Sequence, residues 1–156
     1  MVTEPMSLRG KIITGLVLAL LGWAAWYGYR IVLTVSQIPT AYAAWDTGNL
    51  LVEYMRSNNN RWPSSWDDLL SVINNNPTNQ IQFRGASPGD TNYALSLRQK
   101  VAIDWKFDPS RTNQSSPVTR ADGTKFPVVW DGAEPNDIVH NYLKESARTN
   151  TPKSLP

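Results

Sequence analysis

An uncharged apolar run near the N-terminus constrains this chain more than any other feature. Residues 12–29 read IITGLVLALLGWAAWYGY, with no charged side chain in eighteen positions. A helix of this length extends roughly 27 Å, close to the hydrocarbon thickness of a bilayer, which is about 30 Å. The run continues to Val35 if the long side chain of Arg30 reaches the headgroups. Aromatic residues crowd its second half, as they do at a membrane–water interface: Trp23, Trp26, Tyr27 and Tyr29. We therefore predict a transmembrane anchor over residues 12–35.

The charges beside the anchor predict its orientation. Arg9 and Lys11 precede it, whereas Arg30 is the only charge on the other flank before Asp46. Positive residues concentrate on the cytoplasmic side of membrane helices. We expect residues 1–11 to form a cytoplasmic tail of a single-pass inner-membrane protein, with the lipid bilayer as its first partner and the remaining chain outside the cytoplasm.

A cleaved signal peptide is the alternative to an uncleaved anchor. Ala41 and Ala43 form an A-x-A pattern, which places a cleavage site before Ala44. The apolar part of a signal peptide is usually about 7–15 residues long, shorter than the run seen here. The sequence favours the anchor and leaves a secreted domain beginning at Ala44 open.

The composition predicts one small domain over residues 36–148, followed by a disordered tail over 149–156. Among 156 residues there is no cysteine, so no disulfide supports this domain. The net charge of +2 comes from dispersed residues without a basic block. Nucleic acid is therefore not an expected partner.

Three helical patterns follow the anchor or extend it. Residues 41–58 form an amphipathic spine helix, with Pro39 predicted to kink or interrupt the helix near 36–38. Ser65 and Asp68 approximate a capping box for a second helix that ends at residues 74–77. Asn136 is placed to cap a last helix. On the spine helix, the apolar face is expected to comprise Ala41, Ala44, Trp45, Gly48, Leu51, Val52 and Met55, and the polar face Asp46, Asn49, Glu53 and Arg56. In the last two helices the expected core residues are Leu69, Leu70, Ile73, Ile138, Val139, Tyr142 and Leu143.

Strand patterns occupy the C-terminal half. Residues 101–108 alternate between apolar and polar side chains, residues 126–130 form another apolar run, and residues 81–84 are a further candidate strand. We expect the first two to pair as a hairpin across a polar loop over 109–124. The predicted fold class is α+β: a transmembrane helix continuing into an amphipathic spine helix packed on a small antiparallel sheet, with a C-terminal helix.

This order of elements resembles type IV pilins and, more closely, the minor pseudopilins of type II secretion systems. The local match is Tyr54 followed by Asn60-Arg61-Trp62-Pro63, an aromatic–proline step after the long helix. Arg9-Gly10 stands where that family carries the basic–glycine pair cut by its peptidase. The chain departs from the family at Lys11, where an apolar residue is usual, and at Gly15, where the family has glutamate. The resemblance implies a pilin-like architecture without pilin-type processing, although cleavage after Gly10 stays open.

Residue patterns typical of enzyme active sites are absent from this sequence or have an unsuitable spacing. The single histidine, His140, is expected on the exposed side of the last helix, and no G-x-S-x-G or phosphate-binding glycine loop occurs. Asp104 and Asp108 share one face of a predicted strand roughly 13 Å apart, beyond the spacing of about 5–9.5 Å that glycosidase carboxylates use. The sequence therefore favours a protein that is not an enzyme.

An acidic turn before the last helix is a candidate calcium site. Asp131, Glu134 and Asp137 lie within seven residues of one another around Gly132. Carboxylate oxygens are calcium ligands, and the resembled pseudopilins can carry calcium in C-terminal loops. The alternative is structural: an Asp-Gly turn and a capped helix explain the same residues. No other cofactor is expected, and the sequon at residues 113–115 matters only in a host that glycosylates proteins.

Three functions remain open from the sequence. The first is a structural, assembly or interaction role in the cell envelope, with protein partners bound along residues 12–57. The second is a membrane-tethered binding module that stacks ligands or glycans on Trp62, Trp66 or Trp130. The third is a membrane-tethered hydrolase, which only an unfamiliar loop site would support.

Overall fold

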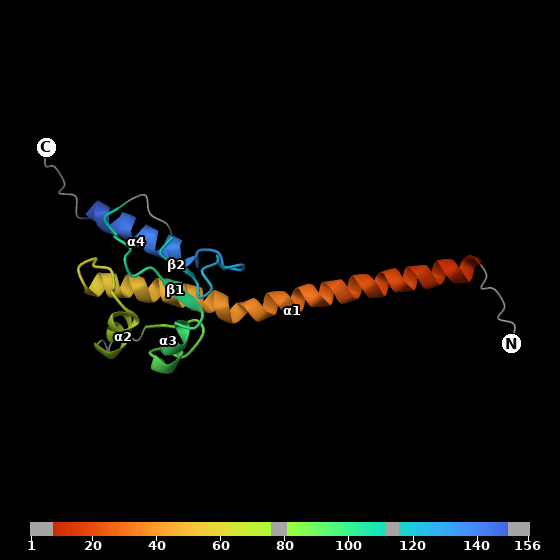
Figure 1. Cartoon of the computed structure of the whole chain (residues 1–156), viewed down its shortest axis with the longest axis horizontal. Helices are drawn as coiled ribbons and strands as arrows, with labels where there is room; N and C mark the ends of the chain where they lie inside the picture. The colour runs from red at the N-terminus through yellow and green to blue at the C-terminus, as the bar shows by residue number, and fades with distance from the viewer. Residues whose placement is uncertain (1–7, 76–80, 112–115, 150–156) are drawn as a thin grey trace. The chain divides into compact units, whose positions relative to one another are not determined.

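The structure is a computed structural model that describes residues 8–75, 81–111 and 116–149. Four helices and two strands follow in the order α1 (Leu8–Ser57), α2 (Trp66–Asn75), α3 (Thr91–Leu97), β1 (Val101–Ile103), β2 (Val118–Arg120) and α4 (Pro135–Thr149) (Figure 1). The predicted α+β class is confirmed, with a long N-terminal helix, a two-stranded antiparallel sheet and a C-terminal helix. The chain divides into two compact units, Met1–Gln37 and Ile38–Pro156.

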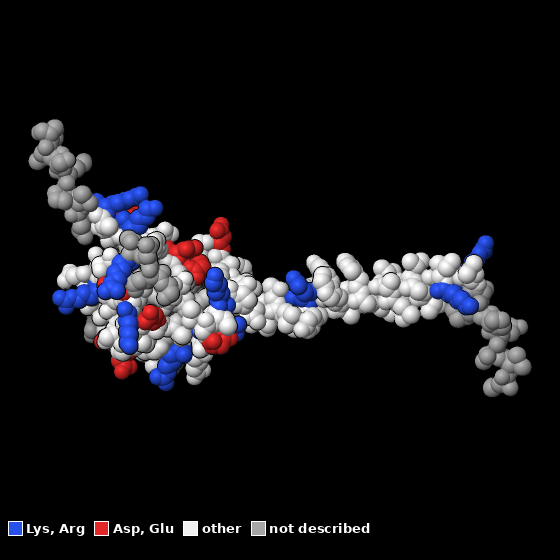
Figure 2. Space-filling view, turned by 45° about the horizontal axis from the view of Figure 1, so that its top comes forward, with Lys and Arg blue, Asp and Glu red and all other residues white. Residues whose placement is uncertain are grey.

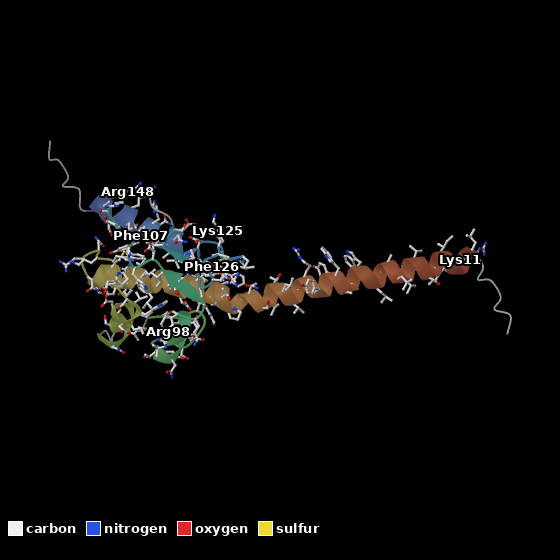
Figure 3. All side chains as sticks on the ribbon, viewed as in Figure 1. Lys11, Arg98, Phe107, Lys125, Phe126 and Arg148 are labelled. Carbon is white, nitrogen blue, oxygen red and sulfur yellow. The ribbon has the colours of Figure 1, made fainter. Side chains whose placement is uncertain are left out.

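The described part of the first unit is a single helix, the N-terminal part of α1, with exposed side chains. Every residue from 11 to 36 is exposed, including large apolar side chains such as Leu20 and Val32, each 65% exposed. This stretch of α1 is long and apolar enough to cross a membrane. Figure 2 shows it uncharged between its N-terminal cations and the next cation along the helix. In Figure 3 its side chains project into open space beyond Lys11. Membrane lipid is the solvent that such a surface fits.

The helix is continuous at the predicted break. Pro39 lies inside α1, and helical backbone continues from residue 36 through residue 40. A proline removes one backbone hydrogen bond, which a helix of 50 residues absorbs because the flanking turns keep theirs. The alternative of an interruption near 36–38 is therefore wrong.

The core of the second unit is contributed by every element in it. Buried side chains come from α1, α2, α3, β1, β2 and α4, namely Leu50, Leu51, Met55, Leu69, Leu97, Val101, Ile103, Val118 and Val139. Within this unit, α4 lies on one side of the second half of α1, and α2 and α3 lie on the other (Figure 1). Gly48 permits close contact with α4, because a Cβ there would lie 3.0 Å from Pro135 Cα and 3.1 Å from Ile138 Cδ1.

The sheet differs from the predicted hairpin. Strand β1 pairs with β2, Val101 opposite Arg120 and Ile103 opposite Val118, so the predicted pairing with residues 126–130 is wrong. The strand β2 lies inside the expected polar loop. Residues 126–130 contain Pro127, which has no N–H to donate to a ladder, and they form no strand.

Strand β1 is also shorter than its alternating pattern. The side chain of Asp104 accepts a hydrogen bond from the Lys106 backbone N–H at 2.9 Å, and its carbonyl accepts one from Phe107 N–H at 3.1 Å. The Asp104 N–H still donates to the Pro117 carbonyl at 2.8 Å, but the N–H groups of Lys106 and Phe107 bond Asp104 rather than a neighbouring strand, and the strand ends at Ile103. The alternation nevertheless places Trp105 and Phe107 against the core cluster or its tryptophans.

The short helices begin at polar caps. Asp68 N–H donates to Ser65 Oγ at 3.2 Å, which confirms Ser65 as the cap of α2, whereas the Asp68 carboxylate accepts from the Ser64 N–H at 2.9 Å and not from Ser65. Helix α3 was not predicted; Asp90 caps it by accepting from Tyr93 N–H at 3.0 Å. Residues 76 and 77 of the predicted α2 end lie outside the described residues.

The start of α4 corrects the predicted cap. Helix α4 begins at Pro135, and Glu134 caps it by accepting a hydrogen bond from Asp137 N–H at 2.8 Å. The Asn136 side chain instead pairs with the backbone of Val118, accepting from its N–H at 2.8 Å and donating to its carbonyl at 3.0 Å. The predicted cap at Asn136 is wrong because this amide joins α4 to β2.

Candidate functional site

A buried carboxylate on α1 organises one end of the second unit. Asp46 is fully buried, although the helical pattern placed it on the polar face. Its Oδ1 accepts a hydrogen bond from Arg84 N–H at 2.8 Å. Its Oδ2 accepts bonds from Gly85 N–H at 3.0 Å and from the Tyr93 hydroxyl at 2.7 Å. The predicted exposure of Asp46 is therefore wrong, because three donors from residues 84–93 replace the water that a carboxylate requires.

Tyr93 and Gly85 are adapted to this carboxylate. Burial, followed by the hydrogen bond to Asp46 and its negative charge, raises the pKa of the Tyr93 hydroxyl far above its usual range. The phenol therefore stays protonated and keeps donating its hydrogen bond. A Cβ on Gly85 would lie 2.1 Å from the Tyr93 hydroxyl oxygen, so only glycine leaves room for this contact. Residues 81–84, a candidate strand in the sequence, form none: the Arg84 N–H bonds Asp46 and the Ile81 carbonyl accepts from the Gly89 N–H at 3.0 Å.

A partly exposed set of aromatic residues lies next to the buried carboxylate in the chain. The Arg84 guanidinium carbon lies 4.7 Å from the ring centroid of Trp45, the residue before Asp46 on α1. Tyr42, one turn earlier, lies 6.0 Å from Trp130 between ring centroids. Trp130 is 40% exposed, and Tyr42 and Trp45 are half-buried. We call these four residues, Tyr42, Trp45, Arg84 and Trp130, the aromatic surface.

The three tryptophans that the sequence nominated for stacking have different surroundings. Trp62 donates its indole N–H to the Asp104 carbonyl at 2.9 Å and packs on Phe107 with ring centroids 4.8 Å apart. Trp66 meets Trp105 edge to face at 5.7 Å. Both are half-buried packing residues, whereas Trp130 belongs to the aromatic surface. The structure thus brings Trp130 together with Tyr42 rather than with the other two.

Among the three acidic calcium candidates, Glu134 has structural hydrogen bonds. Glu134 uses one carboxylate oxygen to cap α4 and the other to accept from the Asn136 amide at 2.7 Å. Asp131 and Asp137 are exposed. Across the part of the chain that the structure describes, no group of three or more acidic, histidine or cysteine side chains is placed to hold a metal ion. The sequon at residues 113–115 lies outside the described residues.

The carboxylates of Asp104 and Asp108 accept hydrogen bonds within local turns. Asp108 accepts hydrogen bonds from the Ser110 hydroxyl at 2.7 Å and its backbone N–H at 3.0 Å, and these bonds lower the pKa of the Asp108 carboxyl. Asp104 bonds Lys106 in the turn that ends β1. Each carboxylate thus has a local partner in the backbone that follows it.

A groove of about 840 Å³ lies between α4 and the segments around residues 107–111 and 116–117. His140, Lys144 and Arg148 lie four residues apart on one face of α4 and line it. His140 is exposed, as expected. Figure 3 labels Arg148 near the end of α4, and Phe107 near the same helix. The other lining residues are Pro109, Ser110, Arg111, Ser116, Pro117, Asn136, Asp137, Val139, Leu143 and Ala147. Arg111, Lys144 and Arg148 outnumber Asp137 among the lining residues, and because Arg111 also pairs with Asp108 at 3.2 Å, the groove suits an anionic ligand mainly through Lys144 and Arg148.

Neither this groove nor the aromatic surface was expected from the sequence. Their residues come from segments far apart in the chain, and only the four-residue spacing of His140, Lys144 and Arg148 is visible without the fold. The chain matches no protein-family model, no curated protein and no solved structure.

Proposed function

We propose that this protein is a non-enzymatic, single-pass component of the cell envelope, anchored by residues 12–35 with its N-terminus in the cytoplasm. Its α+β domain outside the cytoplasm engages protein partners in a structural or assembly role, in a pilin-like arrangement. The single observation that carries this proposal is the uniformly exposed apolar stretch of α1, in which no residue from 11 to 36 is buried. Lipid or partner helices are the surroundings that satisfy such a surface.

Burial of small residues supports an anchor that stays attached. Ala41 and Ala43, which the signal-peptide alternative would remove, are fully buried in the domain. A domain starting at Ala44 would lose their contacts and the first turns of helix before Asp46. The flanking cations Arg9, Lys11 and Arg30 are all exposed, as orientation by charge requires.

N-terminal sequencing of the protein from native membranes tests the anchor. We expect the chain to begin at Met1 or, if only the initiator is trimmed, at Val2. A start at Lys11 would establish pilin-type processing, and a start at Ala44 would overturn the anchored function.

Crosslinking tests the partners. A photoreactive residue in place of Leu20 should capture partner subunits in native membranes, because Leu20 is exposed in the apolar stretch. The same residue in place of Arg98, the exposed residue that follows α3 (Figure 3), is the matched control for random capture. Recovery of monomer alone from a set of positions along residues 12–57 would contradict the assembly role.

The groove favours a second candidate function, binding of an anionic ligand. Its volume of about 840 Å³ and its cations Lys144 and Arg148 support this function, with Arg111 beside them in an ion pair with Asp108. A fluorescent pentaglutamate peptide should bind the full chain in detergent, and the affinity should fall with salt. Lys144→Glu should abolish the signal and Arg98→Glu should not; equal binding by both variants would contradict it.

A further inference from the structure

The groove beside α4 has a negative end and a positive end. Asp137 lies in the first turn of α4, Lys144 and Arg148 lie in its last two turns, and all three line the groove. At 1.5 Å per residue, Asp137 and Arg148 are roughly 16 Å apart along the helix axis. All three side chains are exposed, and no ion pair within the described ranges includes any of them. The groove therefore offers separated charges of opposite sign to a ligand.

Apolar side chains line the same groove. Phe107, Pro109 and Leu143 are half-buried lining residues, and Leu143 lies between Asp137 and Lys144 in the chain. The Phe107 ring is held from behind by Trp62, at 4.8 Å between ring centroids. Acidic residues at the start of a helix and basic residues at its end also complement the helix dipole, but the dipole does not account for apolar side chains beside them. The combination suits a ligand that has an apolar part and separated charges.

The dimensions and charges of the groove favour a short peptide. An extended chain rises about 3.3 Å per residue, so five residues span the distance from Asp137 to Arg148. The volume of about 840 Å³ lies within the range of about 300–1,000 Å³ that is typical of ligand-binding clefts. A uniformly negative strand of nucleic acid would be attracted by Lys144 and Arg148 but repelled by Asp137. A peptide can place a different charge at each end.

We propose that this groove binds an extended segment of a partner protein, about five residues long, with acidic residues at one end, apolar residues in the middle and a basic residue at the other end. The acidic residues bind Lys144 and Arg148, the apolar residues pack on Phe107 and Leu143, and the basic residue lies beside Asp137. The inference rests on the second candidate function, binding of an anionic ligand by this groove, and identifies that ligand as a peptide with separated charges.

Peptides of identical composition provide the test. The full chain in a non-ionic detergent is titrated into fluorescent peptides that are capped at both ends, and binding is followed by fluorescence anisotropy. The two probes are Lys-Phe-Leu-Glu-Glu and its reverse, Glu-Glu-Leu-Phe-Lys, because either chain direction satisfies the proposal. The control, Glu-Phe-Lys-Leu-Glu, has the same net charge and the same apolar residues without the separation of charge. We expect the better probe to bind roughly fivefold more tightly than the control, which is the effect of about one exposed ion pair.

Variants at exposed positions identify the groove as the binding site. The double variant Lys144→Gln, Arg148→Gln should bind the better probe roughly tenfold more weakly than the wild type. Arg98→Gln, which changes an exposed cation outside the groove, is the matched control and should bind as the wild type does. Asp137→Asn should reduce the preference for the better probe over the same peptide with serine in place of its lysine. Replacing the phenylalanine and leucine of the better probe by serine should weaken binding about tenfold or more, because the apolar contacts are lost.

The outcomes separate this inference from the function on which it rests. If pentaglutamate binds through Lys144 while the probes bind no better than the composition-matched control, the anionic-ligand function stands and the peptide inference is overturned. If neither pentaglutamate nor any probe binds, both are overturned. Tighter binding of a six-residue thymidine oligonucleotide than of either probe would identify the ligand as nucleic acid and would also overturn the inference.

Discussion

Removing the Asp46 carboxylate should destabilise the second unit more than removing any other side chain that the helical pattern placed on the polar face of α1. Asp46→Ala leaves three donors without an acceptor: the N–H groups of Arg84 and Gly85 and the Tyr93 hydroxyl. Each unsatisfied buried donor costs about 1–3 kcal/mol. Since Arg84 and Gly85 are exposed residues to which water has partial access, we take the lower part of that range and expect a loss of about 3 kcal/mol. This is a large share of the stability of a small domain, about 5–15 kcal/mol.

The assay is urea unfolding of the full chain in a mild detergent, followed by tryptophan fluorescence. With a denaturant dependence of about 1–3 kcal/mol/M, the midpoint should fall by roughly 1–3 M. Asp46→Asn retains one oxygen acceptor and should lose roughly 1–2 kcal/mol. Glu53→Ala is the matched control, because this carboxylate on the same helix forms only an exposed pair with Arg56 at 2.6 Å, worth about 0–1 kcal/mol. If Asp46→Ala costs no more than Glu53→Ala, or if Asp46→Leu is as stable as the wild type, the argument from unsatisfied donors is refuted.

Three further predictions concern the same unit. Burial and the Asp46 carboxylate raise the pKa of the Tyr93 hydroxyl in the folded state. The protonated hydroxyl therefore contributes its full stability below the unfolded pKa of 10.0, and this contribution is lost as the pH rises above 10.0. Urea midpoints should fall above about pH 10, and they should fall less steeply in Tyr93→Phe. Asn136→Ala removes both bonds to the Val118 backbone and should cost about 2 kcal/mol in urea unfolding, whereas the exposed Asn141→Ala on the same helix should cost little. Gly48→Val forces a side chain against Pro135 Cα and should cost about 1–3 kcal/mol of domain stability by thermal scanning, whereas Gly15→Val meets nothing within 4 Å and should leave that transition unchanged.

Helices with strong periodic patterns were predictable from the sequence, whereas short and non-local features were not. The apolar run, the spine helix, the capping box at Ser65 and the last helix all rest on signals within a few residues of one another. Strand β2 is a three-residue segment inside a polar loop, with no alternation long enough to detect. Helix α3 has only Asp90 as a start signal, in a stretch rich in turn residues.

The candidate site was hidden for a different reason. The partners of Asp46 lie 38 to 47 residues away in sequence, so helical periodicity placed its carboxylate on the polar face. Helical periodicity reflects only the polarity of residues within the helix, so it does not reveal that a loop distant in sequence will form hydrogen bonds to a buried carboxylate. Asn136 was misread in the same way, because its amide bonds Val118, 18 residues earlier, rather than its own helix.

The buried carboxylate links the stability of the domain to the surface that it presents. An apolar residue in place of Asp46 alone would leave its three donors without an acceptor, so Asp46 does more than fill space. Its distinctive effect is to hold the Arg84–Gly85 backbone against α1, beside Trp45. Loss of Asp46 should therefore release Arg84 from the aromatic surface even under conditions where the core remains folded. Asp46→Asn, the milder substitution, is the variant in which disorder of that surface and unfolding of the core can be observed separately.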